Sequence, residues 1–395
     1  MSLLKLIPFL LRRFFKNLRA GKLFVELPSG QKFLIEGKTS KNINATLMIK
    51  SYKLLPLLLF KGGLGAGESY IKGYWTASDL TQILKMAALN RESLSNRLMG
   101  YGAAKFFDRL LHFFRQNSLG RAKKNISYHY DLGNNFYSQW LDESMTYSSA
   151  IFESQESTLN EAQENKYKKL CELVSLSSDD DVLEIGCGWG GLINFIKRKY
   201  SCRMKAITIS DEQFSFIIDK DKEFKPPSET SVELCDYRNL KGKFDKILSI
   251  EMIEAVGAKY WPDYFGTLKR CLRDGGTIGL QAITIKEDFY EDYRKGTDFI
   301  QRYIFPGGML PSLNIIKTIS RRAGLRVIKN SDYGQHYART LKVWRERFNN
   351  SWPVLEKQGF DSRFYRTWDY YLAYCQAGFS QGMINVWQLS LEHDD

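Results

Sequence analysis

A glycine-rich turn is the segment of this sequence whose residue types and spacing point most directly to chemistry. Residues 180–191 read D-D-V-L-E-I-G-C-G-W-G-G, in which an apolar strand runs into a carboxylate and three alternating glycines: Glu184, Gly186, Gly188 and Gly190. Glycine is needed where the backbone must approach a ligand closely. The order E-x-G-x-G-x-G differs from the G-x-G-x-x-G of dinucleotide-binding turns, so it favours S-adenosylmethionine over NAD as the ligand.

Polar side chains follow the next two predicted strands. The second strand leads into T-I-S-D-E-Q at residues 208–213, and the third ends at Asp236 and Tyr237. The carboxyl ends of parallel strands form one edge of a sheet, where ligands bind. S-adenosylmethionine is cationic at sulfur and carries no phosphate, so hydrogen-bonding side chains suit it better than a phosphate cradle. A glycine-rich turn alone can be purely structural, and the combination predicts a cofactor site.

Strands alternate with helices through the last two thirds of the chain. This alternation predicts an α/β fold with a doubly wound, mostly parallel sheet. A linker, N-S-L-G-R-A-K-K-N, precedes the sheet at residues 117–125. We therefore expect a smaller, basic N-terminal domain over residues 1–116 and a catalytic domain over residues 117–395. The predicted elements of the catalytic domain include strands at residues 182–185, 204–209, 244–250 and 277–285 and helices at residues 159–176 and 191–200.

The N-terminal domain is expected to begin with a basic amphipathic helix at residues 3–19. Its apolar face could lie in a membrane with the cations at the headgroups, or it could pack on its own domain. Two short strands are predicted at residues 23–27 and 32–36, joined by a Pro-Ser-Gly turn. The glycine cluster at residues 62–67 is expected to form a loop.

Positive charge is concentrated in the first third of the chain. The 395 residues contain 57 Lys and Arg against 44 Asp and Glu, whereas residues 1–127 contain 22 basic and 6 acidic side chains. This asymmetry suggests an anionic partner, either nucleic acid or a phospholipid surface, although a solvated basic face would look the same. No RNA-binding motif accompanies the charge, so we expect no nucleic-acid partner.

Several classes of protein are disfavoured by what the sequence lacks. Its six cysteines form no C-x-x-C pair and have no histidine at zinc-ligand spacing, so neither a disulfide framework nor a metal site is expected. No apolar run approaches the roughly 20 residues of a membrane span. Arg12 and Arg13 follow the short N-terminal apolar run without a cleavage site, so we expect no export and a reducing compartment.

Besides the glycine-rich turn, the chain carries a series of longer blocks in a fixed order. They are G-E-S-Y-I-K-G-Y-W (67–75), Y-H-Y-D-L-G-N-N-F-Y (128–137), M-T-Y-S-S-A (145–150), S-I-E-M-I-E-A-V-G (249–257), F-I-Q-R-Y-I-F-P-G-G (299–308) and H-Y-A-R-T-L-K-V-W (336–344). In this order they resemble the cyclopropane fatty acid synthase family, which includes the mycolic acid cyclopropane synthases. The resemblance runs over most of the chain and implies the class I S-adenosylmethionine methyltransferase fold.

The resemblance implies methylene transfer from S-adenosylmethionine to the cis double bond of an unsaturated acyl chain in a phospholipid. The alkene attacks the sulfonium methyl group, a carbocation forms, and loss of a proton closes a cyclopropane ring. It also implies a cytoplasmic enzyme that associates peripherally with the inner face of the membrane, with phospholipid and an anionic membrane surface as partners. The sequence leaves open whether the chain pairs as a homodimer.

The same resemblance implies a set of cofactor-binding residues. In this sequence they are Tyr147, Ser148, Glu184, Gly186, Gly188, Gly190, Thr208, Ser210, Gln213, Tyr237 and Arg238. Tyr237 could stack on the adenine ring or could be an ordinary core tyrosine.

The base of this family is assigned to a bound bicarbonate, so the cofactors implied are S-adenosylmethionine and bicarbonate. The residues that match the bicarbonate ligands are Ser149, Glu254, Gln281, the backbone N–H of Ile283, and Tyr337. Ser149 stands where better-known members carry Cys, and Gln281 where they carry His. These changes keep hydrogen-bonding capacity but lose titratable groups. A methyl-branched or methylidene chain, formed without ring closure, therefore stays open as an alternative product.

Cys375 falls on the family's active-site cysteine position, in Y-L-A-Y-C-Q-A-G-F. It has no evident histidine partner, so a role in lining the acyl tunnel is at least as plausible as covalent chemistry. Aromatic side chains suited to shielding a carbocation are Tyr260, Trp261, Phe299, Tyr303, Phe305, Tyr337 and Tyr374. A nucleic-acid methyltransferase and a non-catalytic lipid-binding protein are the alternatives from other classes.

Overall fold

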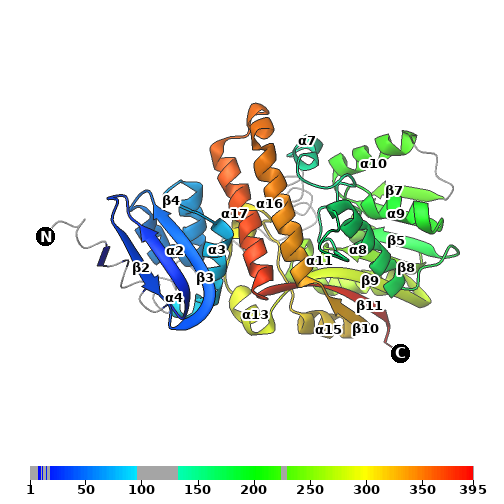
Figure 1. Cartoon of the computed structure of the whole chain (residues 1–395). Helices are drawn as coiled ribbons and strands as arrows, with labels where there is room; N and C mark the ends of the chain where they lie inside the picture. Colours follow the sequence, from blue (N-terminus) through cyan, green and yellow to red (C-terminus); the bar gives the residue numbers. More distant parts are fainter. Residues whose placement is uncertain are drawn as a thin grey trace. The chain divides into compact units, whose positions relative to one another are not determined.

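The computed structural model describes residues 18–95, 132–223 and 229–394, together with residues 8, 9, 11 and 15 (Figure 1). The chain divides into two compact units, each assembled from separate segments. The first unit contains Met1–Phe113, Lys295–Ile304 and Phe348–Met383, and the second contains Phe114–Arg294, Phe305–Arg347 and Ile384–Asp395. In the described ranges, no helix is long and apolar enough to cross a membrane.

This division differs from the predicted split into residues 1–116 and 117–395. Two later segments, at residues 295–304 and 348–383, belong to the first unit. Hydrogen bonds explain why: the Tyr70 hydroxyl donates to Asp369 (2.6 Å), and the Thr81 hydroxyl donates to Gln376 (2.8 Å). The predicted boundary and linker, and most of the amphipathic segment at residues 3–19, lie outside the described residues.

The first unit is built on a four-stranded sheet in the order β2-β1-β3-β4. The first two strands form the predicted antiparallel hairpin, and β1 pairs parallel with β3. Leu23 and Val25 are buried while Phe24 between them is exposed, as the two-residue period of a strand requires. The bounds are β1 (Ala20–Glu26), β2 (Lys32–Glu36), β3 (Thr39–Ile49) and β4 (Trp75–Ala77).

Helices complete the first unit, and one of them corrects a prediction. The glycines at residues 62–67 do not form a loop but lie within helix α2, which bends at Gly62 (φ 56°, ψ −128°). Gly67 is needed because its backbone packs directly on the rings of Phe299 and Tyr370. The helices are α2 (Leu54–Ile71), α3 (Leu80–Leu89), α4 (Arg91–Ser95), α14 (Phe299–Tyr303), α17 (Ser362–Ser380) and the last part of α16 (Gly334–Lys357).

This packing makes Gly67→Ala a test of the first unit. An added Cβ would lie 2.5 Å from Phe299 Cδ2, and overpacking of this kind costs about 1–3 kcal/mol. Gly63→Ala is the matched control, because it lies in the same helix and its Cβ would meet nothing within 4 Å. We expect urea unfolding to show a lower free energy of unfolding for Gly67→Ala and no loss for Gly63→Ala. Equal stabilities would contradict the packing of α2 described above.

The second unit has a seven-stranded sheet in the order β10-β11-β9-β8-β5-β6-β7. The five strands from β9 to β7 run parallel, whereas β11 is antiparallel to both of its neighbours. This confirms the predicted α/β fold with a mostly parallel sheet. The bounds are β5 (Asp181–Ile185), β6 (Arg203–Thr208), β7 (Thr230–Leu234), β8 (Phe244–Ile250), β9 (Leu272–Ile285), β10 (Leu325–Asp332) and β11 (Ile384–His393).

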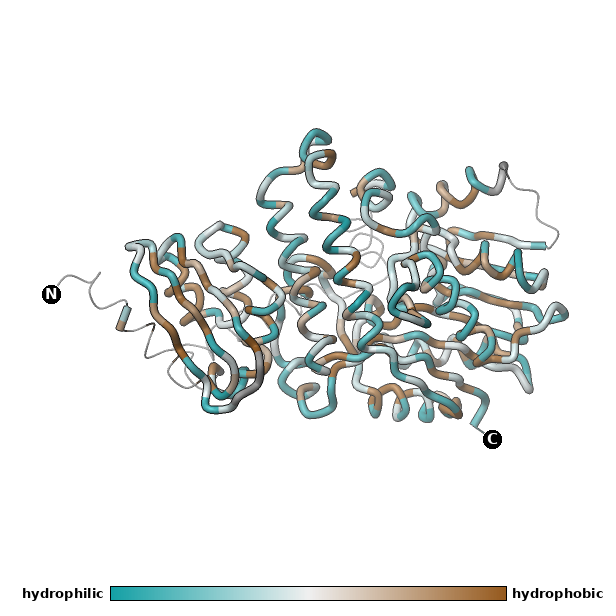
Figure 2. Tube along the Cα trace, in the orientation of Figure 1, coloured by the Kyte–Doolittle hydropathy of each residue, from teal (hydrophilic) through white to brown (hydrophobic). Residues whose placement is uncertain are grey.

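Helices cover both faces of this sheet, as in a doubly wound fold (Figure 1). Alternate residues of β5 enter two different cores: Leu183 and Ile185 pack with α12, and Val182 packs with α8 and α9. Hydrophobic stretches occur both in the strands of this sheet and in the helices that cover it (Figure 2). The helices of this unit are α7 (Asn134–Ser138), α8 (Leu159–Leu173), α9 (Gly191–Lys199), α10 (Asp211–Glu223), α11 (Ile253–Val256), α12 (Trp261–Cys271), α13 (Glu287–Tyr293), α15 (Leu313–Arg322) and the first part of α16.

Candidate active site

A pocket of the second unit lies at the carboxyl ends of β5, β6 and β8, where a parallel sheet places its ligands. Most of the predicted cofactor residues line it: Tyr147, Ser148, Glu184, Gly186, Gly188, Thr208, Gln213, Tyr237 and Arg238. Gly190 and Ser210 do not line the pocket. They shape its wall instead, because Gly190 is the N-cap of α9 and the Ser210 hydroxyl accepts the N–H of Gln213 (3.3 Å) at the start of α10.

The glycine-rich turn adopts a backbone that other residues would not. Gly186, Gly188 and Gly190 have φ of 83°, 54° and 84°, the left-handed region that favours glycine. The N–H of Gly186 donates to the carbonyl of Ile207 (3.0 Å), which fixes the turn against β6. A Cβ at Gly188 would meet nothing within 4 Å, so this part of the backbone faces open pocket.

Glu184 brings a buried carboxylate to the pocket from the end of β5. Its side chain is 3% exposed, and Oε2 has no hydrogen-bond partner in the described structure. Burial raises the pKa of this carboxyl group to about 8, against a smaller opposing effect from Lys166. An unpaired acceptor in an apolar environment is costly, so Glu184 is suited to receive hydrogen bonds from a ligand.

Side chains after the next two strands complete this half of the pocket. Thr208 donates its hydroxyl to Gln213 (2.8 Å), so the two are held together at the end of β6. Asp236 follows β7 and accepts two bonds from the Arg238 guanidinium, at 2.8 and 2.6 Å. That pair opens a short 3₁₀ turn (Tyr237–Asn239) and leaves the Tyr237 ring edge-on to Tyr264, 5.6 Å away.

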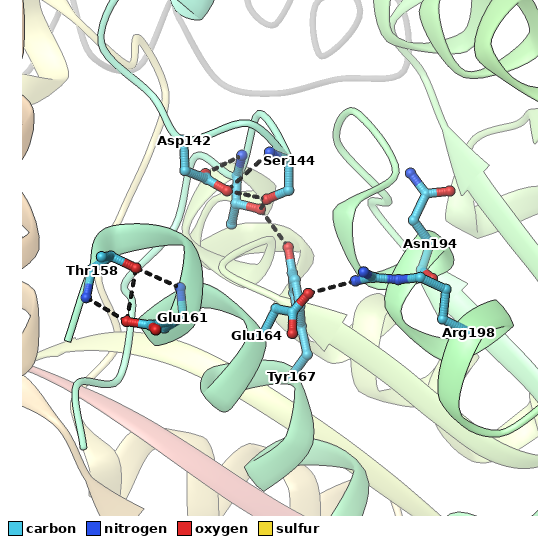
Figure 3. A network of polar contacts seen from close by, with 9 residues as sticks. Asp142, Ser144, Thr158, Glu161, Glu164, Tyr167, Asn194 and Arg198 are labelled. Carbon is cyan, nitrogen blue, oxygen red and sulfur yellow. Dashed lines mark hydrogen bonds and ion pairs between the residues drawn. The ribbon is translucent and has the colours of Figure 1, made fainter.

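A chain of hydrogen bonds fixes the loop that carries Tyr147 and Ser148 against helix α8 (Figure 3). Asp142 accepts the N–H groups of Ser144 and Thr146, both at 3.0 Å. The Thr146 hydroxyl in turn meets the Tyr167 hydroxyl of α8 at 2.6 Å. This network holds the loop on α8 and presents both predicted residues to the pocket.

Two further contacts lie in the first two turns of helix α8 (Figure 3). Thr158 and Glu161 form a capping box at its first turn. Glu164 bonds to Arg198 of α9 at 2.6 Å. This contact links α8, which follows the loop, to α9, which follows the glycine-rich turn.

Lys166 is a buried cation that the sequence reasoning missed. Its side chain is fully buried, its ammonium donates to the Ser148 hydroxyl (2.8 Å), and it lies 4.2 Å from the Tyr167 ring centroid. Burial lowers its pKa, whereas the carboxylates of Glu251, Asp142 and Glu184 act in the opposite direction. Its spacing was the available signal, since it lies four residues after Ala162 on the buried face of α8.

The five residues matched to bicarbonate ligands come together around two carboxylates. Three of them donate to Glu251: the N–H of Ser149 and the Gln281 amide to Oε1, and the Tyr337 hydroxyl to Oε2, each at 2.8 Å. The fourth donor, the N–H of Ile283, bonds to Glu254 Oε1. Glu251, which directly follows β8 and lines the pocket, was not singled out from the sequence.

Gln281 is oriented by a second glutamine on the neighbouring strand. Gln388 of β11 lies opposite it in the register and donates its amide to Gln281 Oε1 (3.0 Å). The same amide also donates to the carbonyl of Lys166 (3.1 Å). With its oxygen occupied in this way, Gln281 can present only its NH₂ group to Glu251.

Burial raises the pKa of the carboxyl groups of Glu251 and Glu254. For Glu254 the value is about 8, because burial is reinforced by the neighbouring charge of Glu251. The pKa of Glu251 is raised by burial, while its three donors and Lys166 oppose the shift. The site therefore favours one ionised and one protonated carboxyl, with the charge on Glu251, which has the donors.

The structure also shows the surroundings of Cys375, His336 and Phe305. Cys375 lies on α17 in the first unit, and burial raises the pKa of its thiol, which disfavours a thiolate nucleophile. His336 accepts the N–H of Phe152 at Nδ1 (3.1 Å) and, in the described structure, does not line the pocket. Tyr147 and Phe305 line the pocket, and their ring centroids lie 6.4 Å apart.

The pocket fits S-adenosylmethionine by the chemistry of its lining. The glycines leave backbone exposed, Glu184 offers an unpaired acceptor, and Thr208, Gln213 and Asp236 add polar groups at the strand ends. The bicarbonate donors fit a separate ion less well, because the Glu251 carboxylate already receives three of them.

Comparison with known proteins agrees with this architecture. A sequence model of the family described as mycolic acid cyclopropane synthetase matches residues 117–389. The chain is 36% identical to the tuberculostearic acid methyltransferase of Mycobacterium tuberculosis, covering 84% of this chain and 79% of that protein. It is 33% identical to the cyclopropane-fatty-acyl-phospholipid synthase of Escherichia coli K12, covering 87% of each.

Solved structures show the same relationship. A cyclopropane synthase of Mycobacterium tuberculosis superposes with a TM-score of 0.64 at 28% identity, covering 68% of this chain and 97% of that one. A mycolic acid cyclopropane synthase solved with S-adenosylhomocysteine and cetyltrimethylammonium bromide also gives 0.64, at 27% identity and the same coverage. The chain therefore belongs to the mycolic acid cyclopropane synthetase family and is an S-adenosylmethionine-dependent methyltransferase of that family.

Proposed function

We propose that this enzyme transfers a methylene group from S-adenosylmethionine to the cis double bond of an acyl chain in a phospholipid, giving a cyclopropane fatty acid. The observation that supports this most is the arrangement of the pocket: predicted cofactor residues line it together with Glu251, a carboxylate suited to accept a proton. Methyl transfer to an alkene needs such a base, whereas transfer to an amine or thiol can proceed without one at this position.

In this proposal, three groups of residues bind different parts of S-adenosylmethionine. Glu184, Gly186 and Gly188 at the end of β5 hold the methionine and ribose portions, supported by Gly190. Thr208, Ser210 and Gln213 shape the nucleoside side, with Tyr237 and Arg238 beside it. Tyr147 and Ser148 close the pocket from the opposite loop.

When bound, S-adenosylmethionine supplies an electrophilic methyl carbon. The alkene's π electrons form the new C–C bond, the C–S bond breaks towards sulfur, and the positive charge is left on the acyl chain. Tyr147 is suited to shield that cation, because it lines the pocket and packs on Trp344 and Trp140 at centroid distances of 5.3 and 5.4 Å. Loss of a proton from the new methyl group then closes the ring.

A second product is favoured by one relative. The 36% identical protein is named a tuberculostearic acid methyltransferase, whose name refers to a methyl-branched chain. If a hydride shifts from the methyl-bearing carbon to the neighbouring cationic carbon before the proton is lost, the methyl group becomes a methylidene group on an open chain. A methyl-branched chain would then require a separate reductant. Both products need the same first step and the same base, and they differ only in where the cation resides.

The acyl chain is proposed to come from a membrane. The E. coli relative is named for fatty-acyl-phospholipids, and the solved relative holds a long-chain ammonium detergent. The basic excess of residues 1–127 suits an anionic phospholipid surface, reached from the cytoplasmic side. Peripheral association follows from this proposal.

The test is transfer of label to lipid. Purified protein is incubated with methyl-labelled S-adenosylmethionine and vesicles of a phospholipid with cis-unsaturated chains, and the fatty acids are released and counted. We expect label in the fatty-acid fraction, and none with vesicles of the fully saturated phospholipid as matched control. Label confined to headgroups, or equal label with saturated chains, would contradict the proposal.

A further inference from the structure

We propose that the side chain of Glu251 is the built-in general base of this enzyme, and that it takes the place which the family fills with a bicarbonate ion. This inference rests on the proposed function, because the proton it removes is that of a methylated acyl chain. It explains why the sequence departs from the family at Gln281, one of the matched ion ligands.

The main support for this role is the set of hydrogen bonds that the Glu251 carboxylate accepts. A carboxylate and a bicarbonate ion present the same planar pair of oxygens to their donors. In this protein three of the residues matched to the ion by the family resemblance donate to Glu251 at 2.8 Å: Ser149 through its backbone N–H, Gln281 through its amide and Tyr337 through its hydroxyl. A separate bicarbonate would have to displace the side chain that these groups already hold.

The backbone at Glu251 supports a specific role. Its φ is 51°, one of four positive values among the described non-glycine residues. Residues other than glycine adopt this region at a cost, and such strained positions cluster at functional sites. The conformation follows directly after β8 and brings the side chain into the pocket wall, so the strain serves to place a carboxylate there.

The presence of Gln281, where the family carries His, also agrees with Glu251 as the base. A mobile ion needs cationic or titratable ligands to be retained, whereas a tethered carboxylate needs only neutral donors. Gln281 is such a donor, fixed by Gln388 so that its NH₂ group faces Glu251. Three ionisable groups act on Glu251 or are acted on by it: the Tyr337 hydroxyl, which donates to it, the buried ammonium of Lys166, and the neighbouring carboxyl group of Glu254. Lys166 also faces the carboxylates of Glu184 and Asp142.

In each turnover, one proton passes from the methylated acyl chain to Glu251. After methyl transfer, one former alkene carbon carries the new methyl group and the other carries the positive charge. Glu251 takes a proton from that methyl group, and the C–H electron pair forms either the third ring bond or, after a hydride shift has moved the charge to the methyl-bearing carbon, the double bond of a methylidene group. Glu251 is left protonated and neutral and returns the proton to water between turnovers. No oxidant or reductant is required.

The test replaces the base and supplies it again from solution. Glu251→Gly removes the carboxylate and suits a positive φ, so the variant should fold. In buffer freed of carbon dioxide, we expect wild-type activity to be unchanged and Glu251→Gly to lose about 10²- to 10⁴-fold in rate. Added bicarbonate or formate should restore part of the lost rate in proportion to concentration.

Two measurements test the role of Glu251 without relying on catalytic activity. Formate should raise the melting temperature of Glu251→Gly and leave that of wild type unchanged, since only the variant has vacant donors. Calorimetry should show nearly unchanged affinity for S-adenosylmethionine. Ser201→Gly is the matched control, because it relieves a similar φ of 54° on an exposed serine and should leave the rate unaltered.

The inference is overturned if wild type loses its activity without bicarbonate, or if Glu251→Gly keeps full activity in carbon dioxide-free buffer. It is also overturned if neither anion restores the rate or shifts the melting temperature of the variant. These results differ from failure of the proposed function, in which wild type itself gives no labelled fatty acid under any condition.

Discussion

Gly188→Leu is expected to abolish S-adenosylmethionine binding while leaving the protein folded. Gly188 lines the pocket, and a Cβ there would meet no protein atom within 4 Å. The leucine side chain would therefore enter the space that the ligand needs rather than collide with the fold. We expect the dissociation constant, measured by calorimetry, to rise by more than about a hundredfold, which corresponds to about 2.7 kcal/mol.

The control separates this effect from backbone strain. Gly188 has φ of 54°, where a leucine costs roughly 1–2 kcal/mol of stability. Gly275→Leu carries a comparable strain, since its φ is 74° and its surroundings are also open, but it does not line the pocket. Both variants should lose similar stability, and only Gly188→Leu should lose binding. Unchanged affinity in Gly188→Leu would contradict the assignment of the turn.

Lys166→Met is expected to lower the free energy of unfolding by roughly 3–5 kcal/mol near neutral pH. The methionine keeps an unbranched side chain, one atom shorter, but removes a fully buried cation that opposes the rise in pKa of Glu184 and Glu251. Without it, those carboxyl groups must be buried uncompensated or protonated. Lys168→Met is the matched control, because that lysine lies in the same helix with its side chain 58% exposed.

The pH dependence of this loss has a definite sign. A carboxyl group whose pKa is raised by folding destabilises the native state as pH rises above its unfolded value, up to about 8 for Glu184. Lys166 offsets that loss only when the carboxylates are ionised, and at acid pH its own buried charge is unfavourable. The difference between wild type and Lys166→Met in urea unfolding should therefore grow from pH 5 to pH 8. A constant or shrinking difference would contradict the proposed coupling.

The part of the site that the sequence predicted well is the part made by consecutive residues. The glycine-rich turn could be located because Gly186, Gly188 and Gly190 all need a positive φ, and a strand and a helix flank them. Polar residues after β6 and β7 could be placed because parallel strands end at one edge of the sheet. Local pattern determines these positions, so it was sufficient to find them.

The glycine cluster at residues 62–67 shows where local pattern fails. Glycine is a poor helix former, so a loop was the natural expectation. Helix α2 forms there because its backbone must approach Phe299 and Tyr370, residues that follow hundreds of positions later. The same long-range packing puts segments after residue 294 into the first unit, which no linker-based boundary could anticipate.

Glu251 and Lys166 were missed for a related reason. Each gains its role from partners far away in the chain: Glu251 from Ser149, Gln281 and Tyr337, and Lys166 from Ser148 together with the carboxylates. Residue type alone distinguishes neither from an exposed charge. The register of β8 and β9 brings Gln281 to Glu251, whereas Ser149 comes from a loop and Tyr337 from α16.

The most direct test of the central claim is the fate of a trideuterated methyl group. The purified enzyme, without added reductant, is given S-adenosylmethionine carrying CD₃ and a cis-unsaturated phospholipid, and the released fatty acids are examined by mass spectrometry. Removal of a proton from the transferred methyl group predicts a product that keeps two deuterium atoms, whether it holds a ring or a methylidene group. A product that keeps all three, or a lipid fraction without deuterium, would contradict the account.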